Sequence, residues 1–84
     1  MIYKVRFTKL AIKELNKLNY NTKSLIIGWI EKNLNDTENP YIHGKPLVGN
    51  KKGQWRYRIG DYRIITEIND NELIILVVEV GHRR

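Results

Sequence analysis

The sequence contains no cysteine, which excludes disulfides, thiolate chemistry and cysteine-based metal sites. Only two histidines are present, His43 and His82, so a structural zinc site is not expected. We therefore predict a protein without metal or other cofactor, whose chemistry rests on ordinary side chains.

Long apolar runs are absent as well. The longest, from Leu73 to Val78, has the length of a strand and is far shorter than the roughly 20 residues of a membrane helix. The N-terminus becomes charged at Lys4 and Arg6 and has no apolar signal-peptide segment. We expect a cytoplasmic protein.

A chain of 84 residues is too short to divide into two cores, so we predict a single domain over residues 1–84. Its hydrophobic fraction of 42% and charged fraction of 29% are typical of globular proteins. Fifteen Lys and Arg against nine Asp and Glu give a net charge of +6, which favours a polyanionic partner such as nucleic acid. The alternatives are that the positive charge binds an acidic protein partner or only keeps the protein soluble.

The first half of the chain has the patterns of one strand and two helices. Residues from Ile2 to Phe7 alternate between apolar and charged, as in a half-buried strand. Thr8 suits the N-cap of a first helix that runs to about Leu18. After a polar break at residues 19–21, Thr22 offers the cap of a second helix. The apolar stripe of this second helix comprises Leu25, Ile26, Trp29, Ile30 and Leu34. The spacing favours an antiparallel helix pair whose stripes face the core rather than a partner.

The segment from Tyr41 to Gly53 is rich in glycine and lysine, which predicts a basic surface loop without further strand or helix. Lys45, Lys51 and Lys52 are candidate anchors for RNA phosphates, although a solvated loop explains them equally well. His43 is interpreted as a turn or surface residue, with contact to substrate or ribosomal RNA as the alternative.

Three strands complete the sequence. Gln54–Ile59 and Tyr62–Ile68 flank the dipeptide Gly60-Asp61, which fits a two-residue type II′ hairpin. After a polar turn, Leu73–Val80 is almost continuously apolar, as expected for a strand covered on both faces or central in its sheet. The order β-α-α-β-β-β predicts an α+β fold, with a small antiparallel-rich sheet and the helix pair on one face.

The hairpin carries the most specific chemical signal. A two-residue loop pairs Arg58 with Arg63, and alternation places Arg56 on the same exposed side. Like charges directly opposite across a ladder are unfavourable, so folding alone does not explain this pattern. Guanidinium groups grip phosphate in a bidentate way and stay charged at physiological pH, which points to a phosphodiester ligand. A solvated face, with the arginines paired to Glu67, is the alternative.

The C-terminal residues Gly81, His82, Arg83 and Arg84 add an imidazole and two cations after the last strand. Cleavage of RNA without a metal requires a group that removes a proton from the 2′-hydroxyl and another that neutralises the phosphorane. His82 is the candidate for acid-base work, because histidine exchanges protons near neutral pH. Arginine is the better charge stabiliser, since it remains protonated.

The segment Gly53-Gln-Trp-Arg-Tyr-Arg-Ile-Gly-Asp-Tyr-Arg-Ile65 and the later Val80-Gly-His-Arg83 resemble the C-terminal half of RelE-type toxins. His43-Gly-Lys-Pro-Leu47 is also similar to that family, so the likeness to the RelE/ParE superfamily covers essentially the whole chain. The resemblance implies a ribosome-dependent, metal-independent endoribonuclease that cleaves messenger RNA in the ribosomal A site and inhibits translation. The family's basic catalytic positions correspond here to Arg56, Arg58, Arg63 and Arg83.

Two departures from the family pattern affect the chemistry. The first two basic positions are commonly Lys but here Arg, which keeps the charge and weakens a role as proton-transfer base. Many members also carry a tyrosine past the last strand, and its absence here shifts acid-base work toward His82. We expect Arg84, like the loop lysines, to contact RNA or ribosome.

The resemblance also implies a cognate antitoxin that covers the toxin. The toxin is then a monomer within a hetero-oligomeric complex, and it contacts DNA only indirectly, through the antitoxin. An acidic antitoxin would complement the net charge of +6. Two alternatives remain: a ParE-like inhibitor of DNA gyrase, and a non-catalytic degenerate toxin that acts as co-repressor. The arginine cluster disfavours the first.

Overall fold

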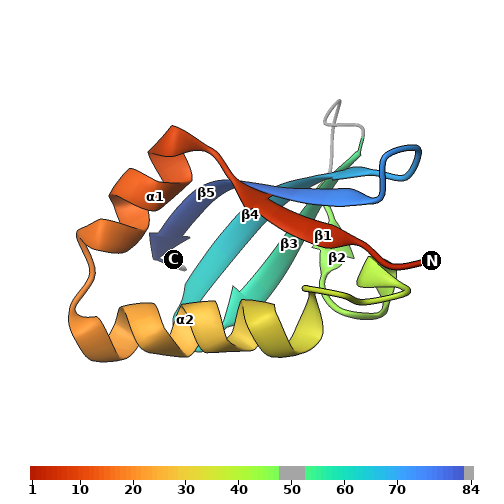
Figure 1. The fold of residues 1–84 in the computed structure, drawn as a ribbon. Coiled ribbons are helices and arrows are strands. Elements are labelled where there is room, and N and C mark those ends of the chain that lie inside the picture. Colours follow the sequence, from red (N-terminus) through yellow and green to blue (C-terminus); the bar gives the residue numbers. More distant parts are fainter. Residues whose placement is uncertain (48–52, 83–84) are drawn as a thin grey trace.

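The sheet has five strands in the order β1-β5-β4-β3-β2. The computed structural model describes residues 1–47 and 53–82. Within them the strands are β1 (Lys4–Phe7), β2 (Lys45–Pro46), β3 (Gln54–Ile59), β4 (Tyr62–Asn69) and β5 (Ile74–His82). β1 and β5 are parallel, and the other neighbouring strands are antiparallel (Figure 1). The predicted α+β class and antiparallel-rich sheet are confirmed.

Both helices lie between β1 and β2 in the sequence. Helix α1 (Lys9–Asn16) is capped by Thr8, as predicted, whose hydroxyl accepts a hydrogen bond from the amide of Ala11. Helix α2 (Tyr20–Asn33) begins earlier than predicted. Its N-cap is Asn19, whose side chain accepts a hydrogen bond from the amide of Thr22, so the prediction of a Thr22 cap is wrong. No helix in residues 1–47 or 53–82 is long and apolar enough to cross a membrane.

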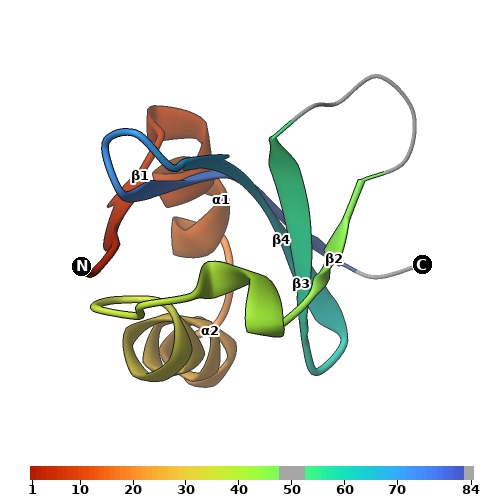
Figure 2. The same ribbon diagram turned by 90° about the vertical axis from the view of Figure 1, so that its right-hand side faces the viewer.

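The two helices cover different strands of the sheet. α1 packs mainly on β5, where the carboxylate of Glu14 accepts a hydrogen bond from the amide of Val80 at 2.8 Å. α2 packs against β3, and Figure 2 shows it on one side of the hairpin formed by β3 and β4. The apolar residues of both helices join those of the sheet in one buried core. Its fully buried members include Ile26, Ile30, Leu34, Tyr57, Ile64, Ile75 and Val77.

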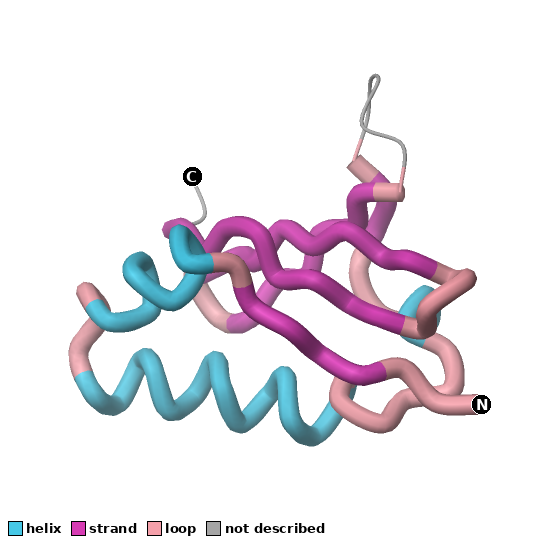
Figure 3. The backbone as a smooth tube through the Cα atoms, turned by 45° about the horizontal axis from the view of Figure 1, so that its top comes forward, coloured by secondary structure: helices cyan, strands magenta, loops and turns pink. Residues whose placement is uncertain are grey.

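The N-terminal strand lies beside the last strand. Figure 3 shows β1, β5 and β4 side by side, with β1 leading through a short connection into α1. Lys4 is paired with Ile74 and Phe7 with Val77. β5 therefore has a partner strand on each edge, which confirms the central position expected from its almost continuously apolar sequence.

The segment that follows α2 is more ordered than predicted. It forms a 3-10 turn, η1 (Pro40–Ile42), and then β2, which pairs with β3 through Lys45 and Arg56. The expectation of a loop without further elements is wrong for this part. Side chains of β3 tie this segment to the sheet through hydrogen bonds to its backbone carbonyls.

The hairpin of β3 and β4 has the predicted register. Arg58 lies opposite Arg63, and Ile59 lies opposite Tyr62. Gly60 has a φ of 59°, as the first position of a type II′ turn requires. This glycine is needed there, because a positive φ is costly for a residue with a Cβ.

Candidate functional site

The arginines lie on the side of the sheet that faces away from the core, here called the outer face. In β3, Trp55, Tyr57 and Ile59 point into the core or are half-buried, so Arg56 and Arg58 occupy the outer face. Arg63 joins them because it lies directly opposite Arg58. Sequence alternation therefore placed these three predicted site residues correctly on one face.

The three guanidinium groups differ in exposure but not in charge. Arg58 and Arg63 are exposed, and Arg56 is half-buried. Within residues 1–47 and 53–82, none of them forms an ion pair. Glu67, the carboxylate proposed as their alternative partner, instead accepts a hydrogen bond from Gln54 at 3.3 Å. The cross-strand repulsion of Arg58 and Arg63 is thus left to water or to an anionic ligand.

Arg63 borders an open hollow of about 540 Å³ in the middle of the outer face. Its lining is mixed: Leu10, Leu47, Ile65 and Val78 are apolar, and the polar residues include Glu79 as well as Arg63. Apolar side chains next to a fixed cation suit a nucleobase joined to a phosphate, since bases stack on apolar or aromatic groups while phosphates pair with arginine.

Arg56 and Arg58 border a second recess, of about 300 Å³, at the edge where β2 meets β3. The same recess is lined by Trp29 of α2, by His43 and by Lys45 of β2. Lys45 lies opposite Arg56 in the ladder, so it adds a third cation to this edge. We call this pocket the edge recess.

Hydrogen bonds from core-facing side chains hold the segment that forms the edge recess. The Tyr57 hydroxyl donates to the carbonyl of Pro40 at 2.8 Å, and burial raises the pKa of Tyr57, so this donor stays protonated. Trp55 Nε1 donates to the carbonyl of His43 at 2.6 Å. Gly44 has a φ of +74°, and a Cβ added there would lie 2.2 Å from the carbonyl oxygen of Arg56. Only glycine lets the chain approach β3 this closely.

The register places His82 on the other side of the sheet from the arginines. It lies opposite Tyr62, and their rings meet edge to face with centroids 5.0 Å apart. Both residues continue the alternation of the buried Ile64 and Val80, whereas Arg63 lies opposite Gly81. The acid-base role of His82 stays a prediction. The other histidine, His43, lines the edge recess with Arg56 and Arg58.

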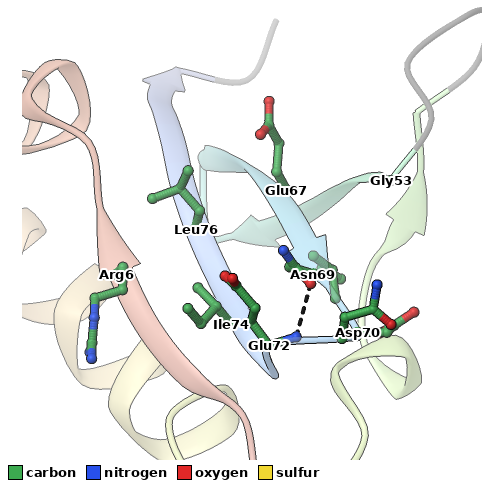
Figure 4. A pocket seen from close by; sticks show the side chains of 10 residues that line it. Arg6, Gly53, Glu67, Asn69, Asp70, Glu72, Ile74 and Leu76 are labelled. Atoms are coloured by element: carbon green, nitrogen blue, oxygen red, sulfur yellow. Dashed lines mark hydrogen bonds between the residues drawn. The ribbon is translucent and has the colours of Figure 1, made fainter.

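The far end of the outer face has the opposite charge. Figure 4 shows Glu67, Asp70 and Glu72 around an open hollow of about 710 Å³, where Asn69 accepts a hydrogen bond from the amide of Glu72. Arg6 is the one basic residue that lines this hollow among the described residues. The outer face is therefore richer in carboxylates at the turn between β4 and β5. At the hairpin end Arg56, Arg58 and Arg63 outnumber Glu79, which lies opposite Ile65.

Asp70 has a structural role at this end. Its carboxylate accepts hydrogen bonds from the hydroxyls of Tyr3 at 2.6 Å and Tyr41 at 2.8 Å, which joins the N-terminus, η1 and the β4-β5 turn. These hydrogen bonds lower the pKa of Asp70. Burial, and then the hydrogen bond to Asp70, raises the pKa of Tyr41 to about 12.

Lys51, Lys52, Arg83 and Arg84 lie outside the described residues. Within residues 1–47 and 53–82, no group of three or more His, Asp and Glu could hold a metal ion. Trp29 was predicted only as a core residue, and His43 was predicted as a turn or surface residue, with contact to substrate or ribosomal RNA as the alternative. The similarity of His43-Gly-Lys-Pro-Leu47 to family members was the only signal that could have drawn attention to His43.

Comparison with known protein families gives one extended match. A family model described as "ParE toxin of type II toxin-antitoxin system, parDE" matches residues 5–84. Among curated proteins, Toxin RelG of Mycobacterium tuberculosis is 31% identical over 83 residues, which cover 99% of this chain and 93% of that protein. A putative RelE-like toxin protein of Escherichia coli is 33% identical over 84 residues, covering 99% and 85% of the two chains.

Solved structures agree with this match. The toxin-antitoxin complex RelBE2 from M. tuberculosis contains a chain with a TM-score of 0.87 and 30% identity, covering 99% of this chain and 93% of that one. The isolated E. coli RelE toxin has a TM-score of 0.79, with 98% and 85% of the two chains covered. At 23% identity this second likeness supports the fold alone.

Proposed function

The chain belongs to the RelE/ParE family of type II toxin-antitoxin toxins, and on this premise we propose that it is an endoribonuclease that cleaves messenger RNA on the ribosome. One observation carries the proposal. Arg58 and Arg63 face each other on the outer face, with Arg56 beside them and no ion pair to any of the three within the described residues. A cluster of unpaired guanidinium groups is costly for a fold and useful for a phosphodiester.

The proposed reaction is attack of a ribose 2′-hydroxyl on the adjacent phosphate. As the phosphorus becomes pentacoordinate, negative charge grows on its oxygens, and Arg58 and Arg63 would neutralise it. The hollow beside Arg63 would hold a neighbouring base. Because the arginines supply the charge stabilisation, we propose that the cleavage needs no metal. Lys45 and Arg56 would bind flanking phosphates and fix the register of the RNA.

We further propose that a cognate antitoxin inhibits the protein. The M. tuberculosis relative was solved as a toxin-antitoxin complex, as were RelE-RelB from Pyrococcus horikoshii and RelBE from E. coli. A net charge of +6 would attract an acidic partner and speed its association at low salt. We propose that the toxin enters this complex as a single folded domain, and that DNA contacts belong to the antitoxin.

A second candidate function is inhibition of DNA gyrase, because the matching family model carries the ParE name. The arginine cluster favours the nuclease, since an inhibitor of a protein enzyme has no need to neutralise a phosphorane. A degenerate toxin without catalysis is the third candidate. Overexpression separates it from the first two, because it would not arrest growth.

The deciding experiment is primer extension on a defined messenger RNA in a purified translation system, with and without ribosomes. We expect cleavage only with ribosomes, reduced at least a hundredfold by Arg58→Ala or Arg63→Ala. The matched control is Arg6→Ala, which removes an exposed cation from the far end of the outer face and should leave cleavage unchanged. Intact RNA in every lane would refute the nuclease and direct the work to gyrase supercoiling. Equal loss in all three variants would indicate a nonspecific effect of net charge.

A further inference from the structure

The edge recess brings one histidine to Arg58, one of the two arginines that stabilise charge in the proposed function. Its lining combines His43 with Arg56, Arg58 and Lys45, and one side is closed by Trp29. His82, the other histidine, is paired with Tyr62 on the opposite side of the sheet. Of the two imidazoles, His43 is therefore the one that shares a pocket with the guanidinium groups.

His43 is held firmly although it lies in a connection. Its carbonyl oxygen accepts the hydrogen bond from Trp55 Nε1 at 2.6 Å. Its ring meets that of Trp29 edge to face, with centroids 5.6 Å apart and an interplanar angle of 70°. The next residue, Gly44, lies against the backbone of β3. A catalytic group needs such support, because a displacement of about 1 Å is enough to lose much of the rate.

The imidazole is also chemically available. It is half-buried, and within the described residues its ring nitrogens form no hydrogen bond or ion pair. The charged groups that line the recess with it are Lys45 from β2 and Arg56 and Arg58 from β3, while α2 contributes the uncharged Trp29. Among the described residues, no carboxylate lines the recess. Its cations would attract an RNA phosphate toward the ring.

We propose that His43 is a catalytic residue that accepts the proton of the ribose 2′-hydroxyl, an inference that rests on the proposed ribonuclease function. The 2′-oxygen forms its bond to phosphorus while its proton passes to the neutral imidazole. The bond from phosphorus to the 5′-oxygen then breaks, and that oxygen takes a proton from water. The products are a 2′,3′-cyclic phosphate and a 5′-hydroxyl, and the proton on His43 returns to solvent. Arginine at both flanking positions stays charged and cannot perform this step.

The test is the pH dependence of single-turnover cleavage on programmed ribosomes, measured for wild type, His43→Gln and His82→Gln. If a neutral imidazole accepts the proton, the wild-type rate should rise with pH and level off once the imidazole is fully deprotonated. His43→Gln should lose this rising limb and cleave about 10² to 10⁴ times more slowly, the usual contribution of a general base. Its affinity for ribosomes should change little, because Gln keeps the polarity and size of the side chain. Imidazole added to His43→Ala should restore part of the rate.

The outcomes separate this inference from the proposed function. A folded His43→Gln that cleaves within threefold of wild type, or that keeps the rising limb, overturns the role of His43. Loss of the limb in His82→Gln instead would assign the proton transfer to the other histidine. If wild type does not cleave, the ribonuclease itself fails. If Arg58→Ala and Arg63→Ala cleave normally, the arginines are not its charge stabilisers. Thermal unfolding of each variant identifies losses of cleavage rate that come from misfolding. For His43→Ala, restoration of the rate by imidazole then shows that the missing group is the imidazole itself, and no restoration contradicts the role of His43.

Discussion

Replacing Gly44 by Ala tests whether the edge recess is built by close contact of its backbone with β3. The added Cβ would lie 2.2 Å from the carbonyl oxygen of Arg56 and 2.9 Å from Cδ1 of Tyr57, at a backbone φ of +74°. The left-handed conformation alone costs about 1 to 2 kcal/mol for a residue with a Cβ. Relief of the clash must move backbone and weaken the Trp55 to His43 hydrogen bond, which adds about 1 to 3 kcal/mol.

Gly53→Ala is the matched control for the Gly44 substitution. Gly53 has a φ of +78°, but its added Cβ would meet nothing closer than the carbonyl oxygen of Ile68 at 3.9 Å. Both substitutions change the unfolded chain equally, so the difference in their free energies of unfolding isolates the clash. Urea denaturation should give a loss of about 1 to 2 kcal/mol for Gly53→Ala and about 1 to 3 kcal/mol more for Gly44→Ala. Equal losses would refute the argument that close approach shapes the recess.

Three further predictions concern charge, capping and pH. Arg58→Met should raise the free energy of unfolding by a few tenths to about 1 kcal/mol, because it removes the repulsion from Arg63, and it should abolish cleavage. If thermal denaturation shows that this variant is less stable than wild type, the arginine pair is not repulsive. Asn19→Ala should cost about 1 kcal/mol in urea denaturation and Thr22→Ala much less, and the reverse order would restore Thr22 as the cap. Asp70→Asn should be less stable than wild type at neutral pH. The lowered pKa of Asp70 means that the stability from its carboxylate is present above its ordinary value of 3.8 and lost as the pH falls through the folded value. The two unfolding curves should therefore converge in acid, and a constant gap would contradict this assignment.

The hairpin could be predicted from sequence because its register depends only on local features. A two-residue turn fixes which residues face each other, so the pairing of Arg58 with Arg63 followed directly from Gly60 and Asp61. The α+β order was predictable for a similar reason, since each helix and long strand has its own apolar period.

The edge recess could not be predicted, because it depends on contacts between distant segments. β2 has only two residues and no periodicity of its own. It exists because side chains of β3 hold the preceding segment, as Trp55 does through the carbonyl of His43. The helix cap was ambiguous for a local reason, since Asn19 and Thr22 both carry suitable oxygen atoms. The side of the sheet on which His82 lies could have been predicted from sequence, because residues two apart in a strand face the same side and Val80 is buried.

The parallel pairing of β1 with β5 has a consequence for the synthesis of the protein. Lys4 finds its partner Ile74 only after nearly the whole described chain has been made, and the central position of β5 depends on both of its neighbours. Contacts between residues so far apart in sequence form late and slowly. The sheet that carries the arginine hairpin is therefore complete only when β5 lies between β1 and β4. The arginines consequently share one finished outer face only after the last strand in the sequence has joined the sheet.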